Sequence, residues 1–264
     1  MPNVSVIMGI YNCAQTLSNC IESLLEQSYT DWELIMCEDC SYDNTFAIAQ
    51  SYATKYSNIQ VFKNKENKGL AYSLNECLKV AKGKYIARMD GDDLCLPQRF
   101  QKQVDFLETN TEFHVVGSSV VLYDENGYKG IRKMIEKPSI YDLAKTVPHI
   151  HPTIMMRKVA YDALNGYIVS PRTRRGQDAD LWFRFYAKGF RGYNFQEPLC
   201  KYHESLSDYK KRSIKVALYG MQTRYIGFKI LRLPIPCYIY IFKSLISALL
   251  PNKIRYFYHK QIKG

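Results

Sequence analysis

The first third of the chain alternates between two hydrophobic patterns. Short runs of mostly apolar, often β-branched residues predict strands buried on both faces of a sheet, at residues 4–10, 32–37, 59–62 and 85–89. Between these runs, apolar residues recur three or four positions apart, which predicts helices over residues 17–25, 46–56 and 70–81. This repeated order of strand and helix is typical of an α/β protein with a parallel sheet and right-handed connections.

The regularity weakens after Asp93. The turn sequence Asp124-Glu-Asn-Gly127 predicts a hairpin, because Asn-Gly suits the tight turn between antiparallel strands. We expect strands at residues 115–123, 128–134 and 153–156, and helices over residues 97–107 and 179–188. The sequence shows neither an internal repeat nor a low-complexity linker, so one folded region is expected to extend to about residue 208.

The composition favours a folded protein whose charge is unevenly distributed. The 264 residues are 47% hydrophobic and 23% charged, which allows a sizeable core and excludes disordered and collagen-like chains. The net charge is +11, yet residues 1–208 hold 24 basic and 25 acidic residues, a balance of −1. Residues 209–264 hold the other 12 basic residues and no acidic ones. This segment is therefore expected to meet phosphate groups, either on lipids or on nucleic acid.

The basic segment also contains the most hydrophobic stretch of the chain. Residues 234–250 are mostly apolar, but this run of 17 residues is shorter than the roughly 20 that a spanning helix needs. The polar residues at 243, 244 and 247 share one helical face, which is typical of a helix that lies in a membrane interface. Two alternatives remain open, a C-terminal helix packed on the core and a dimer contact.

The N-terminus and the cysteines favour a reducing compartment. Residues 1–10 lack the basic region and the long apolar run of a signal peptide, so we expect a cytoplasmic protein. The eight cysteines are scattered and are expected to remain thiols. Cys37 and Cys40 form one C-x-x-C pair, but no second pair lies nearby to complete a zinc site, so we interpret them as small structural residues.

Polar residues follow three of the predicted parallel strands. Tyr11-Asn12 follows the first strand, Glu38-Asp39 the second and Asp90-Gly91-Asp92-Asp93 the fourth. Ligands of open parallel sheets bind beyond the carboxyl ends of the strands, where these residues would meet. Three carboxylates within four residues repel one another and suit a hard cation such as Mg²⁺ or Mn²⁺ that also holds substrate phosphates. A solvated acidic loop is the alternative.

Seven short motifs occur in order along the chain. They are Val4-Ser-Val-Ile-Met-Gly-Ile-Tyr-Asn12, Glu38-Asp-Cys-Ser-Tyr-Asp43, Asn67-Lys-Gly69, Lys84-Tyr-Ile-Ala-Arg-Met-Asp-Gly-Asp-Asp93, His151-Pro-Thr153, Gln177-Asp-Ala-Asp-Leu-Trp182 and Tyr202-His203. Together they resemble the family 2 inverting glycosyltransferases, particularly the bacterial enzymes of surface-polysaccharide assembly. The resemblance covers about residues 3–207 and implies the GT-A fold, with a Rossmann-like, mostly parallel central sheet flanked by helices.

The resemblance also implies a domain organisation. We expect a catalytic domain over residues 1–208, with a nucleotide-binding half over about 1–95 and an acceptor half over about 96–208. Residues 209–264 would form a basic, apolar helical tail that associates with the membrane surface.

The resemblance assigns the donor and metal sites. Tyr11 would stack on the nucleotide base, and Asp39 would accept a hydrogen bond from the base ring N–H, which favours uridine. Asp92 would ligate Mn²⁺ or Mg²⁺ on the diphosphate, with His203 completing the metal shell. The other expected nucleotide contacts are Asn12, Glu38, Lys68, Asp90 and Gly91. The alternatives are a packed strand-end aromatic for Tyr11, a helix cap for Asp39 and a structural hydrogen-bonding role for His203.

Asp178 matches the position of the family's catalytic base. An inverting transfer is one displacement at the anomeric carbon, and a single carboxylate that removes the proton of the acceptor hydroxyl is sufficient. Asp178 could also cap the helix that begins there. The expected diphosphate or acceptor contacts are Asp93, Arg172, Arg174, Arg175, Gln177 and Trp182, although the arginines could equally form a solvated charge run.

The sequence departs from the family pattern at three places. Gly9-Ile10 stands where the family has Pro-Thr, Glu38-Asp39-Cys40-Ser41 replaces Asp-Asp-Gly-Ser, and Gln177 replaces a glutamate. The metal acid and the base are both retained, so these departures bear on base selectivity and acceptor contacts.

The function that the resemblance implies is transfer of a sugar from a nucleotide-sugar, expected to be a UDP-sugar, to a hydroxyl of a lipid-linked saccharide. The protein would lie on the inner face of the cell membrane and would bind no nucleic acid. Two alternatives are a non-catalytic sugar-nucleotide binder and a nucleic-acid-binding protein that uses the basic tail.

Overall fold

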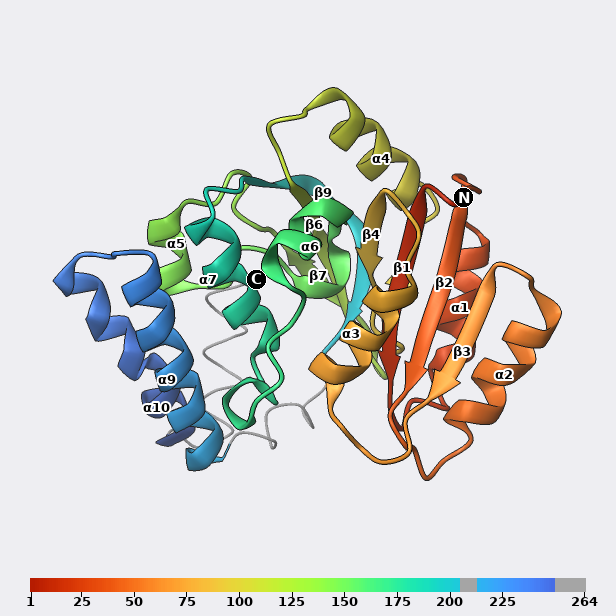
Figure 1. Ribbon diagram of the computed structural model, residues 1–264, viewed down its shortest axis with the longest axis horizontal. Helices are drawn as coiled ribbons and strands as arrows, with labels where there is room; N and C mark the ends of the chain where they lie inside the picture. The colour runs from red at the N-terminus through yellow and green to blue at the C-terminus, as the bar shows by residue number, and fades with distance from the viewer. Residues whose placement is uncertain (205–212, 250–264) are drawn as a thin grey trace.

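The computed structural model describes residues 1–204 and 213–249. Its centre is one β-sheet whose described strands follow the order β3-β2-β1-β4-β8-β6-β9-β5, with β7 paired to β6 (Figure 1). Strands β3, β2, β1 and β4 are mutually parallel, and β8 joins β4 to β6 through antiparallel pairing. The strands are β1 Val4–Ile10, β2 Trp32–Glu38, β3 Ile59–Lys63, β4 Tyr85–Arg88, β5 Leu94–Cys95, β6 Val115–Asp124, β7 Gly127–Arg132, β8 Met155–Arg157 and β9 Gly192–His203.

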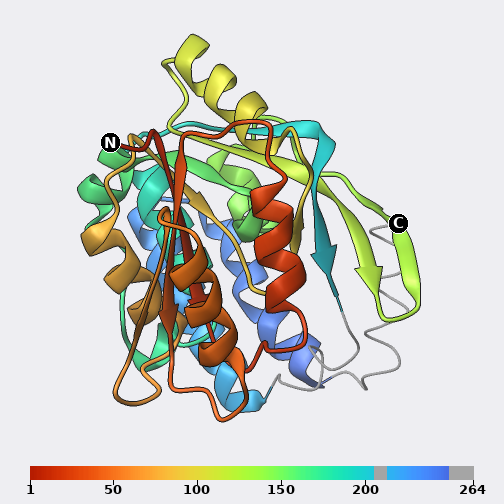
Figure 2. The same cartoon turned by 90° about the vertical axis from the view of Figure 1, so that its right-hand side faces the viewer.

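Helices cover both faces of the sheet and create two hydrophobic cores (Figure 1 and Figure 2). One core lies between the sheet and the helices α1 Leu17–Leu25, α2 Thr45–Lys55 and α4 Arg99–Thr109. The other lies between the sheet and the helices α3 Leu70–Val80, α5 Ile140–Lys145, α6 Lys158–Leu164 and α7 Gln177–Ala187. Strands β1 and β2 are buried along nearly their whole length, which explains their continuous apolar runs.

The parallel strands place the candidate residues at one edge of the sheet. Ile10 at the end of β1 pairs with Glu38 at the end of β2, and β4 runs parallel to β1 on its other side. The loops that follow these three strands are therefore neighbours, as the sequence predicted.

The C-terminal part of the described chain packs on the second core. It comprises helix α9 Ile214–Ile230, the 3₁₀ helix η3 Ile235–Phe242 and helix α10 Lys243–Leu249. Phe228, Leu231, Leu233 and Ile241 are buried in that core, and a Cβ on Gly227 would lie 2.2 Å from the ring of Phe183. Residues 213–249 are thus built into the body of the protein, in agreement with the packed-helix alternative.

Other parts of the predicted tail fall outside the described residues. These are residues 209–212 and 250–264, which include Arg255, Lys260 and Lys263. Within the described ranges, the chain contains no helix that combines the length and the apolar character needed to cross a bilayer.

The second half of the chain differs most from the sequence prediction. The strand expected at 153–156 forms as β8 Met155–Arg157, two residues later than predicted, because His151–Thr153 adopt the 3₁₀ turn η1. Strand β9 was not predicted, although it pairs with β6 along most of its length. Gln196, Glu197 and Pro198 interrupt its apolar pattern, and the register with β6 shifts at that point, so period-two alternation fails there.

Candidate active site

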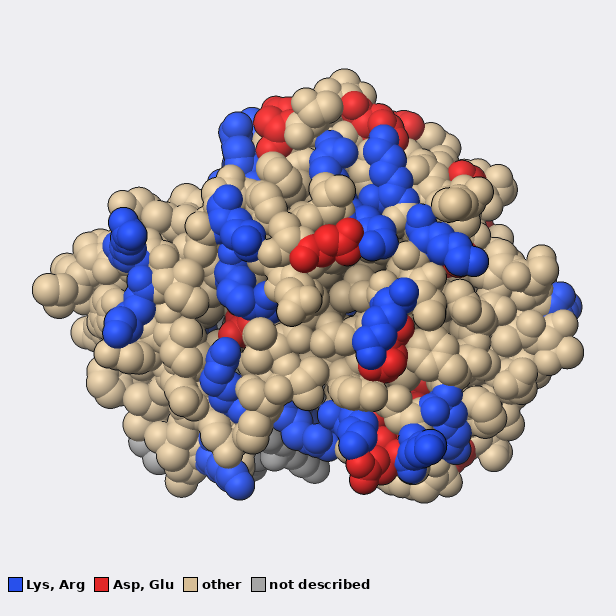
Figure 3. Space-filling model, viewed as in Figure 1, with Lys and Arg blue, Asp and Glu red and all other residues tan. Residues whose placement is uncertain are grey.

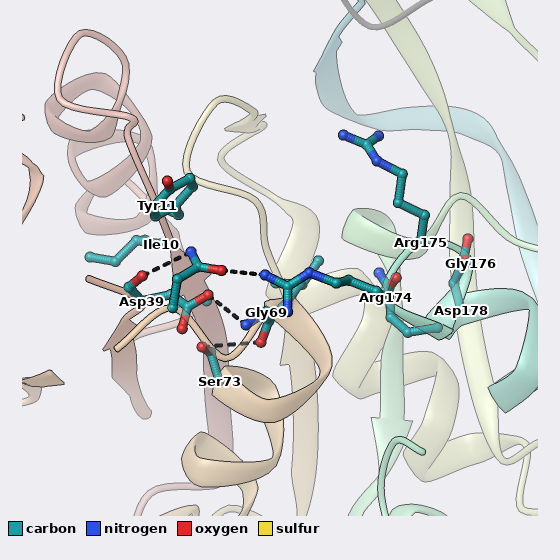
Figure 4. Close-up of a pocket in the computed structure, with 13 residues that line it drawn as sticks. Ile10, Tyr11, Asp39, Gly69, Ser73, Arg174, Arg175, Gly176 and Asp178 are labelled. Atoms are coloured by element: carbon teal, nitrogen blue, oxygen red, sulfur yellow. Dashed lines mark hydrogen bonds between the residues drawn. The ribbon is translucent and has the colours of Figure 1, made fainter. Parts of the chain in front are cut away.

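A cavity of about 480 Å³ opens at the carboxyl ends of β1 and β2 (Figure 4). Its size lies within the range that is common for small-molecule sites. Figure 4 shows Tyr11, Asp39 and Gly69 on one side of it, and Arg174, Arg175 and Asp178 on the other. The lining residues are Gly9, Ile10, Tyr11, Asp39, Asn67, Gly69, Leu70, Ser73, Arg174, Arg175, Gly176, Gln177 and Asp178.

Tyr11 and Asp39 both line this cavity, but they differ in their exposure to solvent. The Tyr11 side chain is 46% exposed, and its ring lies 6.2 Å from that of Tyr42 in an edge-to-face arrangement. Asp39 is buried, and its oxygens accept hydrogen bonds from the backbone N–H groups of Lys68 (2.8 Å) and Gly69 (2.7 Å). Asp39 is therefore fixed, with part of its accepting capacity already used by the protein.

Three further predicted nucleotide contacts serve the loops around the cavity and do not line it. Glu38 is buried, accepts a hydrogen bond from the backbone N–H of Ser41 and pairs with Lys63 at 3.5 Å. The Oδ1 of Asn12 accepts a hydrogen bond from the backbone N–H of Tyr42 at 3.1 Å. Lys68 pairs with the exposed Glu66 and borders a neighbouring cavity of about 370 Å³.

The acidic loop after β4 brings three carboxylates together. Ligand oxygens of Asp90, Asp92 and Asp93 lie within 4.8 Å of one another. Partial desolvation and the neighbouring Asp90 carboxylate raise the pKa of Asp92 to about 6. Asp93 is buried, its pKa is raised by burial and by Asp90, and its Oδ2 has no hydrogen-bond partner. A hard divalent cation fits this donor set, because it would relieve the repulsion and satisfy the orphaned oxygen.

Gly91 allows the acidic loop to lie close to the first loop. A Cβ at this position would stand 3.0 Å from the Sγ of Cys13, so the Cys13 side chain would have to move by a few tenths of an ångström.

His203 lies beside the acidic loop but outside its ligand cluster. Its backbone N–H donates to Asp93 Oδ1 at 2.8 Å, and its imidazole packs edge-to-face on Tyr123 with a centroid distance of 5.3 Å. Its Nε2 lies 3.5 Å from Glu125 Oε1. The charge of His203 acts on Asp92, whereas the group that could hold a metal ion among the described residues consists of the three aspartates.

Arg88 is a buried charged residue beside the candidate site that the sequence did not single out. It is 2% exposed at the end of β4, its Nη1 pairs with Asp90 Oδ2, and its Nε has no hydrogen-bond partner among the described residues. Its charge also lowers the pKa values of Asp93 and Asp178, against the larger effect of their burial. An arginine inside an otherwise apolar predicted strand, directly before an acidic cluster, was the available signal.

Asp178 lies in the first turn of α7 and lines the cavity opposite Asp39. Burial raises the pKa of its carboxyl group, whereas a backbone N–H and the charge of Arg88 oppose this rise. Helix α7 begins after Gly176, whose φ of 90° is left-handed, and no side chain caps it there. The carboxylate of Asp178 is therefore available to the cavity.

The predicted phosphate and acceptor contacts separate into two groups. Arg174, Arg175 and Gln177 line the cavity, and Arg174 reaches across it to donate to Asn67 Oδ1 at 2.6 Å (Figure 4). Arg172 points elsewhere, because it pairs with Asp180 at 2.7 Å and donates to Thr223 of α9 at 3.3 Å.

Trp182 is not brought to the cavity either. It is 1% exposed and packs in the core between the rings of His149 and His151, with centroid distances of 4.7 and 5.5 Å.

Comparison with known proteins identifies the family. Residues 5–165 match Glycosyl transferase family 2, and the chain belongs to this family. It is 49% identical over 261 residues to EpsE of Bacillus subtilis, named as a glycosyltransferase, covering 98% of this chain and 94% of that one. It is 41% identical over 113 residues to WfaP of Escherichia coli, covering 43% and 44% of the two chains. WfaP is named as a UDP-Glc:alpha-D-GlcNAc-diphosphoundecaprenol beta-1,3-glucosyltransferase.

Solved structures show that the fold is GT-A. TarS of Staphylococcus aureus, residues 1–349 in complex with UDP, matches with a TM-score of 0.66 and 17% identity, covering 100% of this chain and 88% of that one. The mannosyltransferase PcManGT of Pyrobaculum calidifontis, in complex with GDP-Man and Mn²⁺, matches with a TM-score of 0.65 and 18% identity, covering 97% and 79%. The chain is a glycosyltransferase with this α/β fold.

Proposed function

We propose that this glycosyltransferase moves a sugar from a UDP-sugar to a hydroxyl of a lipid-linked saccharide, with inversion and with a divalent cation, in bacterial surface-polysaccharide synthesis. The observation that carries the proposal is the composition of one cavity. Asp178 lines it together with Tyr11 and Asp39. The positive charge of Arg88 lowers the pKa of Asp178, and the same arginine forms an ion pair with Asp90 of the acidic loop. A proposed base and a proposed nucleotide-binding edge thus line one cavity, and the charges of Arg88 and Asp90 couple the acidic loop to that base.

The donor assignment rests on Tyr11 and Asp39. The exposed ring of Tyr11 offers a stacking surface for a base. The Oδ1 of Asp39 already accepts from the Lys68 backbone N–H and the Asn64 side-chain amide, and its Oδ2 accepts from the Gly69 backbone N–H, so accepting capacity remains on Oδ2. TarS was solved with UDP, which supports the choice of uridine for a chain of the same fold.

The cation assignment rests on Asp90, Asp92 and Asp93, with Asp92 as the proposed principal ligand and His203 as a proposed additional one. When bound, Mn²⁺ or Mg²⁺ would neutralise the charge that develops on the departing nucleoside diphosphate. Arg88 holds Asp90 in place, and Arg174 and Arg175 add positive charge at the cavity wall. The mannosyltransferase of the same fold was solved with Mn²⁺.

The chemical step that we propose needs one base. The carboxylate of Asp178 accepts the proton of the acceptor hydroxyl while its oxygen attacks the anomeric carbon and the bond to the diphosphate breaks. Arg88 favours the ionised form of Asp178, which is the form that can accept a proton. Because the attack is a single in-line displacement, the configuration at the anomeric carbon inverts.

The acceptor and the location are proposed from the relatives and the C-terminal segment. WfaP is named for a saccharide carried on diphosphoundecaprenol, and a lipid carrier presents its saccharide at the bilayer. We therefore propose a peripheral position on the inner face of the cell membrane. Nucleic acid is not a proposed partner, because the basic excess occurs in a segment that also carries the most hydrophobic stretch.

Calorimetric titration with UDP, in the presence and absence of Mn²⁺, tests the donor and cation sites. We expect binding that requires Mn²⁺ and is lost in Asp92→Ala, whereas Asp105→Ala, an exposed aspartate on α4, binds like the wild type. Absence of UDP binding under every condition would overturn the donor assignment. Release of UDP from UDP-sugars by the wild type then separates an enzyme from a non-catalytic binder.

A further inference from the structure

The C-terminal helices expose an apolar face. Ile235, Ile239, Phe242 and Ile246 are 86%, 71%, 52% and 58% exposed, and they lie within twelve successive positions of η3 and α10. We call these four residues the apolar face. Isolated exposed apolar side chains are ordinary, but several large ones close together in one short segment mark a contact surface.

The polar residues of the same segment point the other way. The Lys243 ammonium donates to the backbone carbonyl of Lys145 at the end of α5, at a distance of 2.8 Å. Ser244 packs toward α9, since a Cβ on Gly220 would lie 3.2 Å from its hydroxyl. Lys243 and Ser244 therefore face the protein together with the buried Ile241, while the residues of the apolar face remain exposed.

The charge around the apolar face is positive. Lys229 and Arg232 are exposed at the end of α9, and the sequence holds no acidic residue from position 209 onward. In Figure 3 the left margin of the molecule, which α9 and α10 form in Figure 1, shows tan and blue surface without red. A second copy of the chain on this face would bring these cations together, which opposes self-association.

We propose that the apolar face inserts into the interface of a bilayer that contains anionic lipids. Isoleucine and phenylalanine side chains would enter the boundary of the acyl chains, and the surrounding lysine and arginine residues would meet lipid phosphates. This membrane contact rests on the proposed function, because a lipid-linked acceptor would be presented at the bilayer. The apolar face would be the surface through which the enzyme reaches it.

Helix α9 connects this surface to the active site. Its Thr223 accepts a hydrogen bond from Arg172, five residues before Gln177, and the charge of Asp178 reaches the neighbouring Arg224. Arg224 also donates to the carbonyl of Ala144 at 3.1 Å, beside the carbonyl that Lys243 contacts. Helix α9 thus contacts α7, the helix that carries Asp178. Helix α10, which carries part of the apolar face, also packs on α9.

Co-sedimentation of the full chain with phosphatidylcholine vesicles, with and without phosphatidylglycerol, tests the proposal. We expect the wild type to bind the phosphatidylglycerol vesicles more strongly. The triple variant Ile235→Ser, Ile239→Ser, Phe242→Ser should lower the partition coefficient by about tenfold or more. A control triple variant, Tyr128→Ser, Ile131→Ser, Val159→Ser, removes apolar side chains that are 68%, 42% and 67% exposed elsewhere and should bind normally.

Three outcomes distinguish membrane binding by the apolar face from self-association and from failure of the proposed function. Equal vesicle binding by the wild type and the first triple variant would overturn the proposal. A wild-type dimer that becomes monomeric in that variant, measured by sedimentation velocity, would assign the face to a second copy and overturn it as well. UDP titration in the presence of Mn²⁺ should be unchanged in the variant, so failure of nucleotide binding in both proteins would instead overturn the proposed function.

Discussion

Asp178 gives the proposed reaction a characteristic pH dependence. Burial raises the pKa of its carboxyl group above the ordinary value for aspartate, and the base must be ionised to accept a proton. Turnover should therefore fall as the pH decreases through this raised pKa, so that the acid limb of the pH–rate profile lies above the ordinary titration range of an aspartate. Steady-state UDP release measured across the acid range checks this.

Replacement of the same residue separates chemistry from binding. Asp178→Asn should lower turnover by about 10²-fold or more, because an amide cannot accept the proton, while the affinity for UDP changes little. Asp162→Asn changes an exposed aspartate whose partner is Lys158, and it should retain full turnover. Near-normal turnover of Asp178→Asn would remove this residue from the role of base.

Arg88 is expected to be as important for stability as for the site. It is buried and pairs with Asp90, so Arg88→Met leaves the crowded carboxylates without their internal cation. We expect a loss of about 3–5 kcal/mol in the free energy of unfolding, as for other broken buried pairs. Lys158→Met breaks a partly exposed pair on α6 and should cost about 0.5 kcal/mol. Urea titrations without added metal distinguish the two, and similar losses would contradict a special role for Arg88.

At the residue scale, the sequence predicts the positions that depend on local order along a strand. Tyr11, Asp39 and the acidic loop follow β1, β2 and β4 directly, so the topology alone brings them to one edge. Arg172 could not be placed in this way, because its partner Thr223 is 51 residues away on a helix that the sequence assigned to a separate tail. Trp182 was misplaced for a similar reason, since the core that encloses it is assembled from distant elements.

At the element scale, the junction of α9 and α7 depends on one glycine. A Cβ on Gly227 would lie 2.2 Å from the ring of the buried Phe183, so Gly227→Ala must displace one of the two helices. We expect it to lower the free energy of unfolding by about 1–3 kcal/mol, despite the better helix propensity of alanine.

A second glycine in the same helix provides the matched control. A Cβ on Gly220 meets the hydroxyl of Ser244 at 3.2 Å, a small side chain that can give way. Gly220→Ala should therefore be close to neutral in the same denaturation experiment. Equal effects of the two substitutions would show that helix propensity, and not the contact with Phe183, decides the outcome.

Helices and strands with a simple hydrophobic period were predicted well from the sequence. Elements that form only because a distant segment packs beside them were not. The hairpin of β6 and β7 forms around Asp124-Glu-Asn-Gly127 as expected. Strand β5 has only two residues, Leu94–Cys95, and exists because β9 lies beside it. The sequence predicted a helical tail here, but not that helix α9 packs on the catalytic domain. The helix carries apolar residues on more than one side, some packed on α7 and some exposed, so no single apolar face identified its partner.

At the scale of the whole molecule, residues 213–249 complete the hydrophobic core of the catalytic domain. Phe228, Leu231, Leu233 and Ile241 are each at most 8% exposed. Removing four such side chains forfeits roughly 6–12 kcal/mol at about 1.5–3 kcal/mol each. This loss is similar to the whole stability of an ordinary domain, about 5–15 kcal/mol, so the earlier residues are not expected to form a stable protein alone.

Truncation tests this dependence and separates it from membrane binding. A chain that ends at residue 212 should lose its cooperative unfolding transition and its UDP binding together, since Arg172, next to the cavity-lining segment, also loses its contact with Thr223. A control chain that ends at residue 249 retains every described helix and should unfold cooperatively. Circular dichroism during heating, followed by UDP titration, measures both properties. A stable, UDP-binding protein of 212 residues would show that the C-terminal helices serve the surface alone and that the catalytic core is complete without them.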